Sequence, residues 1–312
     1  MARAAWTDLL DPDEATLRAE LPHDVGHDTL STLLRPADPD GGRIRPSIRS
    51  QGSYVVGILL VAVAVPEEDL LYYQEADFVL TRDRIVTVRK TPGDREPFPP
   101  ERVEEVCDQH EHELPPGMIA YHLVEEIAER YLDLIDDVDG EIDELEENID
   151  VWPAAKSRLR LSELRHDLLH LRKTLTPTRD AVREIVDGRV DIEGRRPFAR
   201  EVFPRDIERL FSTTYDKLLR ASESIDYARD LLAAARDYQQ AKISIDQNEV
   251  VKKLTVIASL ILVPTFIVGL YGQNFIRSMP ELKWTYGYWW SWGLIIITTV
   301  LQLIYYRRKR WI

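Results

Sequence analysis

The sequence LTVIASLILVPTFIVGLYGQN occupies residues 254–274 and contains no charged side chain. At about 1.5 Å per residue, its apolar part forms a helix roughly 27 Å long, close to the thickness of about 30 Å of a bilayer's hydrocarbon core. We therefore predict that this stretch crosses a membrane. Its last residues, Gly272, Gln273 and Asn274, are small or polar, and we expect the functional site there.

A second apolar run lies close behind the first, at residues 289–306, and ends in the basic sequence RRKR at 307–310. Two lysines at 252–253 precede the first run. Because positive charge collects on the cytoplasmic side of a membrane, we predict that both termini are cytoplasmic and that the loop at 275–288 faces outward. Trp and Tyr residues near both ends of the second run are typical of interfacial anchors. The expected location is the plasma membrane, crossed twice.

Composition limits the classes of function. The chain has 312 residues, a formal net charge of −14 and a pI near 5.1. Nucleic-acid binding needs a basic surface, so nucleic acid is not an expected partner, whereas an acidic chain attracts cations. The single cysteine, Cys107, forms no intrachain disulfide. The sequence lacks a phosphate-binding loop, a Gly-x-Ser-x-Gly motif and a Cys/His cluster with metal-ligand spacing, so we expect neither an enzyme nor a bound cofactor.

The first part of the chain, 1–116, is predicted to be a cytoplasmic domain that contains a β-sheet. Residues 1–50 show no sustained period, so we expect loops around one or two short elements. A helix at 101–113 could pack on the sheet. Apolar and β-branched content marks the predicted strands at 53–65, 77–81 and 85–89.

The next part, 117–250, is predicted to form long cytoplasmic helices. A strongly acidic helix at 118–151 turns back at Trp152 and Pro153 into a helix at 155–187. The first half of that helix is basic, so the two helices can pair by charge. A dense strip of acids is usually only solvated; the alternative is that it concentrates divalent cations or faces the basic C-terminal tail.

These parts together predict an α+β fold class. A cytoplasmic α/β/α domain precedes long stalk helices, which continue into two C-terminal transmembrane helices. The first transmembrane helix covers 251–274, and the second covers 289–312 with the basic tail. The loop between them, 275–288, lies outside the cytoplasm.

A third cytoplasmic helix starts near Arg205, and no Gly or Pro interrupts it before Pro264. One helix of roughly 60 residues, about 90 Å long, therefore runs into the membrane. Its apolar residues alternate spacings of four and three from Ile207 to Ala235, which is the seam of a coiled coil. Such a helix could carry a cytoplasmic event to the membrane.

Two helices cannot enclose an aqueous path, so an ion pore would need a symmetric oligomer in which each copy contributes one helix to the axis. Continued into the first span, the seam becomes a mostly apolar stripe with Asn and Thr at intervals, which suits a narrow path that closes by dewetting. Packing between helices explains a stripe of small and hydroxyl residues equally well. The candidate pore-lining residues are Asn248, Val251, Leu254, Thr255, Ala258, Leu262 and Thr265.

Three motifs near the C-terminus, YGQNF at 271–275, MPEL at 279–282 and RRKRW at 307–311, together resemble the CorA family of magnesium and cobalt transporters. That family carries Tyr-Gly-Met-Asn at the end of its first span and Met-Pro-Glu-Leu in the loop. The resemblance is densest over 248–312. It implies a homopentamer with a funnel-shaped cytoplasmic domain, in which the first span lines the pore and the second forms an outer ring.

The resemblance also implies a role for the end of the first span. Mg²⁺ gives up its waters reluctantly, so a pore that holds the hydrated ion suits it better than one that strips it. Gly272, Gln273 and Asn274 are the implied selectivity filter, where Asn274 amides and carbonyls around Gly272 would accept hydrogen bonds from ion-bound water. Glu281 in the outer loop would add a ring of negative charge at the mouth, or it pairs with a neighbouring basic residue.

Two departures from the family leave alternatives open. Gln273 replaces the motif's Met, and ZntB-type zinc transporters also vary that position, so a zinc transporter, proton-coupled or not, is the second hypothesis. Thr213 stands where the family's magnesium-sensing site has an acid, although Mg²⁺ is still a candidate regulatory ion. A hypothesis from another class is a membrane-anchored signalling coiled coil that conducts nothing; a pentamer favours the pore and a dimer favours signalling. The candidate regulatory or electrostatic residues are Asp216, Asp237, Arg307, Arg308, Lys309 and Arg310.

Overall fold

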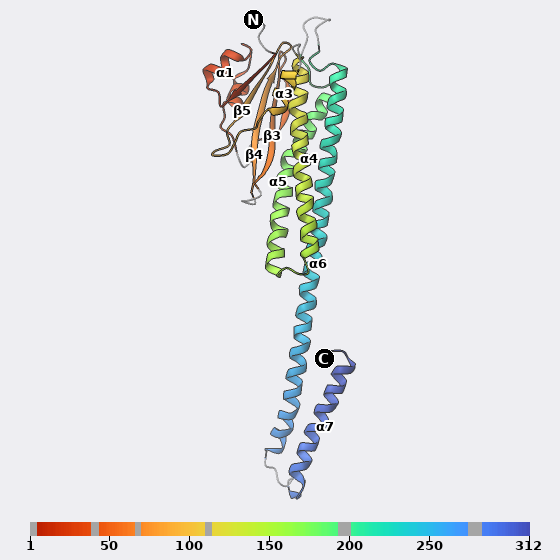
Figure 1. The fold of residues 1–312 in the computed structure, drawn as a ribbon. Coiled ribbons are helices and arrows are strands. Elements are labelled where there is room, and N and C mark those ends of the chain that lie inside the picture. Colours follow the sequence, from red (N-terminus) through yellow and green to blue (C-terminus); the bar gives the residue numbers. More distant parts are fainter. Residues whose placement is uncertain (1–4, 39–43, 66–69, 110–113, 193–200, 274–282) are drawn as a thin grey trace. The chain divides into compact units, whose positions relative to one another are not determined.

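The computed structural model of the chain describes residues 5–38, 44–65, 70–109, 114–192, 201–273 and 283–312. Contacts divide it into two compact units, Met1–Ala235 and Arg236–Ile312. Helix α6 (Arg205–Tyr271), which has 67 residues, contributes to both units (Figure 1). The long uninterrupted helix predicted from Arg205 onward is therefore confirmed.

The first unit contains a five-stranded sheet with the order β1-β5-β4-β3-β2. Its centre is the antiparallel pair β3 and β4, and β1 lies parallel to β5 at one edge. The strands predicted at 53–65 and 85–89 are confirmed, whereas the one predicted at 77–81 is the end of a longer strand. The strand bounds are Trp6–Leu10 for β1, Ser47–Ser50 for β2, Val55–Val65 for β3, Leu70–Leu80 for β4 and Ile85–Lys90 for β5.

The N-terminal 50 residues hold more regular structure than the sequence indicated. In place of one or two short elements, the described part of this segment forms two strands and two helices, namely β1, α1 (Glu14–Glu20), α2 (His27–Leu33) and β2. Each helix has seven residues, which is too short for a helical period to stand out. Strand β1 pairs with β5, about 80 residues later, so no local pattern marks it.

Helices cover both faces of the sheet, which confirms the α/β/α arrangement. Helices α1 and α2 pack on one face through Leu17, Leu30 and Leu33, against valines of β4 and β5. The other face carries the larger core, which the sheet shares with the following helices. These are α3 (Glu101–Gln109), α4 (Pro116–Asn148) and α5 (Ala154–Val186).

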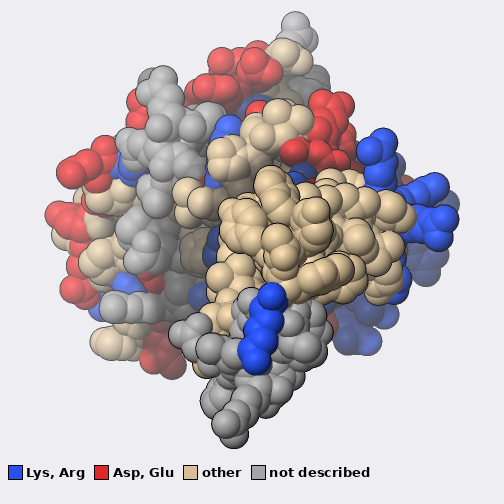
Figure 2. Space-filling view, turned by 90° about the horizontal axis from the view of Figure 1, so that it is seen from below, with Lys and Arg blue, Asp and Glu red and all other residues tan. Residues whose placement is uncertain are grey.

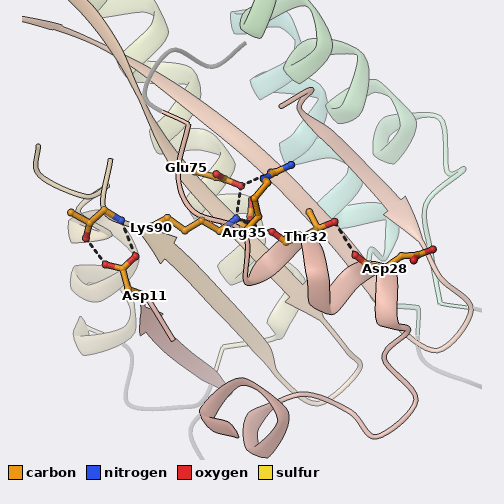
Figure 3. Close-up of polar contacts among 8 residues, drawn as sticks. Asp11, Asp28, Thr32, Arg35, Glu75 and Lys90 are labelled. Atoms are coloured by element: carbon orange, nitrogen blue, oxygen red, sulfur yellow. Dashed lines mark hydrogen bonds and ion pairs between the residues drawn. The ribbon is translucent and has the colours of Figure 1, made fainter. Parts of the chain in front are cut away.

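A buried ion cluster lies where the sequence of β4 turns polar (Figure 3). The ammonium of Lys90 lies 2.6 Å from a carboxylate oxygen of Glu75 and 2.9 Å from one of Asp77, and it also donates to the carbonyl of Thr32 in α2. Burial raises the pKa of Asp77 well above its ordinary value, and Lys90 only partly offsets that effect. The cluster ties α2 to the sheet. Its polar residues also explain why the apolar pattern of the sequence did not indicate the first half of β4.

Helices α4 and α5 form a hairpin that turns at Trp152 and Pro153, as predicted. The contact between them is largely apolar, and Arg160 crosses it to reach Glu141 at 2.9 Å. The sequence suggested that charge pairing holds the two helices together. An ion pair is present, but apolar packing makes up most of the contact. Arg172 of α5 also reaches Asp226 of α6 at 2.7 Å.

The predicted seam of α6 is buried against α4 and α5 of the same chain (Figure 1). Tyr121 of α4 stacks edge-on against Phe211, and Arg179 of α5 donates to Ser222. The apolar seam predicted from the alternating spacing is thus buried, and its partners are helices of the same chain. The buried seam residues are Ile207, Phe211, Thr214, Leu218, Ala221, Ile225, Ala228, Leu232 and Ala235.

The second unit consists of the rest of α6 and of α7 (Gly287–Arg308). Both helices are long and apolar enough to cross a membrane, and their apolar stretches are almost wholly exposed within the chain. Seen from the end of this hairpin, uncharged side chains form one continuous patch (Figure 2). The two predicted spans thus correspond to helices that find few partners in their own chain.

Candidate functional site at the end of helix α6

One face of α6 packs against α7 in the second unit. Val256 and Ile267 are buried on this face. Between them, Ser259 accepts a hydrogen bond of 2.8 Å from the Tyr306 hydroxyl, and its backbone carbonyl lies 3.4 Å from the Gln302 amide. Since Ser259 and Tyr306 are 47 residues apart, no local sequence pattern indicated this contact. It fixes which side of α6 faces α7.

Two residues of the predicted pore stripe, Ala258 and Thr265, lie on the other side of α6. Ala258 is two residues from Val256, and Thr265 is two residues from Ile267, which places each about 160° around the helix from the face that packs on α7. Every residue of the predicted stripe is exposed in the chain, namely Asn248, Val251, Leu254, Thr255, Ala258, Leu262 and Thr265. The chain leaves all seven uncovered, with Thr255 and Leu262, four and three residues from Ser259, nearer the α7 side than Ala258 and Thr265 are.

The hydroxyl groups of this stripe are already satisfied as donors. Thr255 donates to the carbonyl of Val251 at 2.8 Å, and Thr265 donates to the carbonyl of Ile261 at 2.7 Å. Such bonds to the preceding turn leave the hydroxyl oxygens free to accept. The exposed stripe therefore offers neutral acceptors to water or to a hydrated cation.

Helix α6 ends at the predicted filter. The amide of Gly272 donates to the carbonyl of Val268 at 2.9 Å, and the amide of Gln273 lies 3.3 Å from the carbonyl of Leu270. The last carbonyls of a helix have no partner within it, and they form the negative end of the helix dipole, which favours a cation. Gly272 and Gln273 are both exposed, while Asn274 and Glu281 lie outside the described residues.

The candidate regulatory acids lie on the uncovered face of α6. Asp216 is two residues from the buried Thr214 and Leu218, and Asp237 is two residues from the buried Ala235, so both acids point away from α4 and α5. Both are exposed, as is Thr213. The basic tail, Arg307 to Arg310, is exposed in the second unit.

The acidic strip of α4 is exposed along its second half. Asp136, Asp139 and Asp143 follow one another at spacings of three and four, so they share a face. Partial burial and repulsion from its two neighbours raise the pKa of Asp139. Among the described residues, however, no three His, Cys, Asp or Glu side chains gather closely enough to hold a metal ion.

A partly buried network between α4 and α6 was not indicated by the sequence. Lys217 contacts the carboxylates of Glu125 and Glu129, and Thr214 donates to Glu125. Arg102 of α3 completes the network by pairing with Glu129. The signal available in the sequence was Thr214, a polar residue at a seam position of an otherwise apolar helix.

Comparison with known proteins places these features in one family. The family model described as CorA-like Mg²⁺ transporter protein matches residues 2–308. A cobalt/magnesium transport protein CorA of Thermotoga maritima is 29% identical over 197 residues, which are 62% of this chain and 52%, about half, of that protein. A magnesium transport protein CorA of Sodalis glossinidius is 28% identical over 99% of this chain and 92% of its own length.

A solved structure shows the same fold. The complete CorA magnesium transporter from Methanocaldococcus jannaschii superposes with a TM-score of 0.78 and 19% identity, over 98% of this chain and 91% of that one. The predicted mixed α/β domain, long stalk helix and two C-terminal apolar helices are thereby confirmed.

Proposed function

Because this chain belongs to the family of CorA-like Mg²⁺ transporter proteins, we propose that it carries divalent cations across the plasma membrane, Mg²⁺ first and Co²⁺ as well. The family is one of transporters, which agrees with the expectation that the chain is not an enzyme. The proposed assembly is a homopentamer whose residues 1–250 and basic tail lie in the cytoplasm. Negative charge on the chain, −14 in total, would draw cations inward.

The observation that carries the proposal is the position of the stripe on α6. A pore needs a helix face that its own chain leaves uncovered, because copies must turn that face toward a common axis. Ala258 and Thr265 lie on such a face, opposite the side that packs on α7. The stripe would line the axis, and α7 would form the outer ring.

Ion selection is proposed at the end of α6. Five copies would point the negative ends of five helix dipoles, and the carbonyls around Gly272, at one position on the axis. Neutral oxygens from Gln273 and Asn274 could accept hydrogen bonds from the waters of a hydrated Mg²⁺ and still release it. Glu281 would raise the cation concentration at the outer mouth.

Closure is proposed to come from the cytoplasmic side. Asp216 and Asp237 lie on the face of α6 that α4 and α5 leave open, so a cation could bridge them to a neighbouring copy as the cytoplasm fills. Stalks held together in this way would narrow the axis at Leu254 and Leu262, where apolar side chains exclude water. Thr213, which lacks a charge, would weaken this bridge relative to an acid.

The transported ion is tested by flux into liposomes that contain the purified protein. Mg²⁺, Co²⁺ and Zn²⁺ are compared with and without a pH gradient, and native mass spectrometry gives the number of copies. We expect Mg²⁺ entry driven by voltage and independent of the pH gradient, through a pentamer. Entry of Zn²⁺ alone, dependent on the gradient, would assign the protein to zinc transport, and a non-conducting dimer would favour signalling.

The site assignment is tested by two pairs of variants. Asn274→Ala should abolish uptake while the pentamer persists, whereas Asn148→Ala, at the half-buried last residue of α4, should transport normally. In a chain without Cys107, a cysteine replacing Ala258 should react with a water-soluble thiol reagent and lose flux. A cysteine replacing the adjacent Ile257 should be protected by lipid, and equal reactivity of both would refute the proposed pore face.

A further inference from the structure

A groove of ≈ 490 Å³ lies between α6 and α7 within the second unit, and the function proposed above makes no use of it. Its volume falls within the range of about 300–1,000 Å³ that is usual for small-ligand sites. The lining is predominantly apolar and aromatic, and it includes Pro264, Ile267 and Tyr271 of α6 and Tyr288, Trp292 and Ile295 of α7.

The lining changes character in the same direction on both helices. On α6 it runs from Pro264 to Tyr271 at the helix end, and on α7 it runs from Ile295 back to Tyr288 near the helix start. Both ends that carry a phenol are therefore the ends that approach the connecting loop. Ser291 adds a hydroxyl beside Tyr288, to whose carbonyl it donates at 2.9 Å. The groove is apolar toward the middle of the membrane and hydroxylated toward its outer surface.

This gradient matches the chemistry of a lipid. An acyl chain is apolar along its length and ends at ester and headgroup oxygens, which Tyr hydroxyls at an interface can bond. The groove also opens on a surface that a bilayer would touch, since Tyr288 and Trp292 are both exposed in the chain. Ile267 and Tyr271 lie well away from the stripe of Ala258 and Thr265, and only Val268, three residues from Thr265, borders it, so the groove opens beside the proposed pore face and not onto it.

We propose that this groove binds one acyl chain of a phospholipid from the outer leaflet. Burying the chain between the two helices removes apolar surface that would otherwise be poorly packed. Tyr271 lines the groove and directly precedes Gly272, so the bound chain also supports the end of α6. Lipid at this site would therefore stabilise the conformation of the residues proposed as the filter.

The test uses the full chain reconstituted in nanodiscs that contain a phospholipid with a photoreactive diazirine in its acyl chain. After irradiation, mass spectrometry of peptides locates the adducts. We expect adducts concentrated on 264–271 and 288–295. Ile295→Trp should reduce them by about tenfold, because the larger side chain occupies the groove. The matched control is Ile296→Trp, at an exposed isoleucine of α7 that does not line the groove, and it should leave them unchanged.

Two outcomes would overturn the proposal. Adducts spread evenly over both helices, and insensitive to Ile295→Trp, would show ordinary contact with surrounding lipid only. A change in the number of copies in Ile295→Trp, seen by native mass spectrometry without loss of adducts, would assign the groove to a neighbouring copy. Adduct formation requires no ion flux, so failure here is distinguishable from failure of the proposed transport function.

Discussion

Helix α6 has two parts that meet different environments. From Arg205 to Ala235 it buries a regular apolar seam against α4 and α5 of its own chain. From Arg236 to Tyr271 it is mostly exposed, and the face that packs on α7 is its main contact within the chain. Phe211 in the first part is fully buried, whereas Phe266 in the second is 67% exposed. The same helix is thus held by its own chain in one unit and left open in the other.

This difference shows which part of α6 is fully covered by its own chain and which part is not. An exposed apolar helix face is unfavourable in water but not in lipid, and it is also the surface that copies use to associate in a membrane. The first part of α6 therefore owes its stability to intramolecular packing. In the proposed assembly, the second part would depend on the bilayer and on other copies of the chain.

The largest effect is expected from removing a buried aromatic residue of the first part. Phe211→Ala should lower the free energy of unfolding of the first unit by about 3–5 kcal/mol, because it leaves a cavity against Tyr121 and Phe203. Denaturant unfolding of the full chain in detergent, followed by circular dichroism, measures this loss. Phe266→Ala is the matched control and should change the same free energy of unfolding by less than about 1 kcal/mol. Equal losses would remove the contrast between the two parts.

A smaller effect is expected from breaking an ion pair. Lys217→Met leaves the buried carboxylate of Glu125 without its ammonium, so it should cost about 2 kcal/mol, less than a fully buried pair because Lys217 is partly exposed. In the second part of α6, Lys253 pairs with Glu249 at 2.8 Å where both side chains are exposed. Lys253→Met should have no measurable effect on the same unfolding transition. A comparable cost at both lysines would contradict the difference in burial.

The network around Glu125 should also make the stability of the first unit depend on pH. Burial raises the pKa of Glu125, but hydrogen bonds from Lys217 and Thr214 outweigh that effect and hold it below its ordinary value. The contribution of Glu125 is therefore complete above its unfolded-state pKa and is lost as pH falls through its folded pKa. Unfolding midpoints measured from neutral to acidic pH should decline less steeply in Glu125→Gln. An unchanged slope would mean that Glu125 titrates alike in both states.

The smallest effect on stability is expected at a glycine of the exposed part. A Cβ at Gly269 would meet no atom of the chain within 4 Å, so Gly269→Ala should change the unfolding free energy by no more than about 1 kcal/mol. Ion flux should nevertheless fall, because the methyl group would project toward the proposed axis. Gly293→Ala on α7 is equally unobstructed and should keep full flux. Normal flux in Gly269→Ala would argue against close approach of copies at this position.

Much of the fold follows from local patterns in the sequence. The apolar period predicted α4, α5 and α6 closely, because each is long enough for the period to repeat many times. Strand β3 was recognisable from its run of β-branched residues. In contrast, β1 and the first half of β4 were missed, since one depends on pairing with β5 and the other carries the acid Glu75 in a buried cluster.

Part of the candidate site could also be predicted from a local pattern in the sequence. Gly272 and Gln273 stand out because polar and small residues end an apolar run. The orientation of α6 could not be predicted from the sequence, because it depends on the hydrogen bond between Tyr306 and Ser259. The groove beside Tyr271 likewise requires residues from two helices that no short motif connects.

By itself, the amino-acid sequence determined that this protein has two helices apolar enough to span a membrane, a long helix with an apolar seam, and a polar motif at the end of the first apolar stretch. Tertiary structure alone decided which partner covers that seam and which face of α6 stays open. The physical reason is that hydrophobic attraction is not directional. A periodic apolar face shows that something must cover it, whereas the choice among its own chain, lipid and another copy depends on how distant elements fit together.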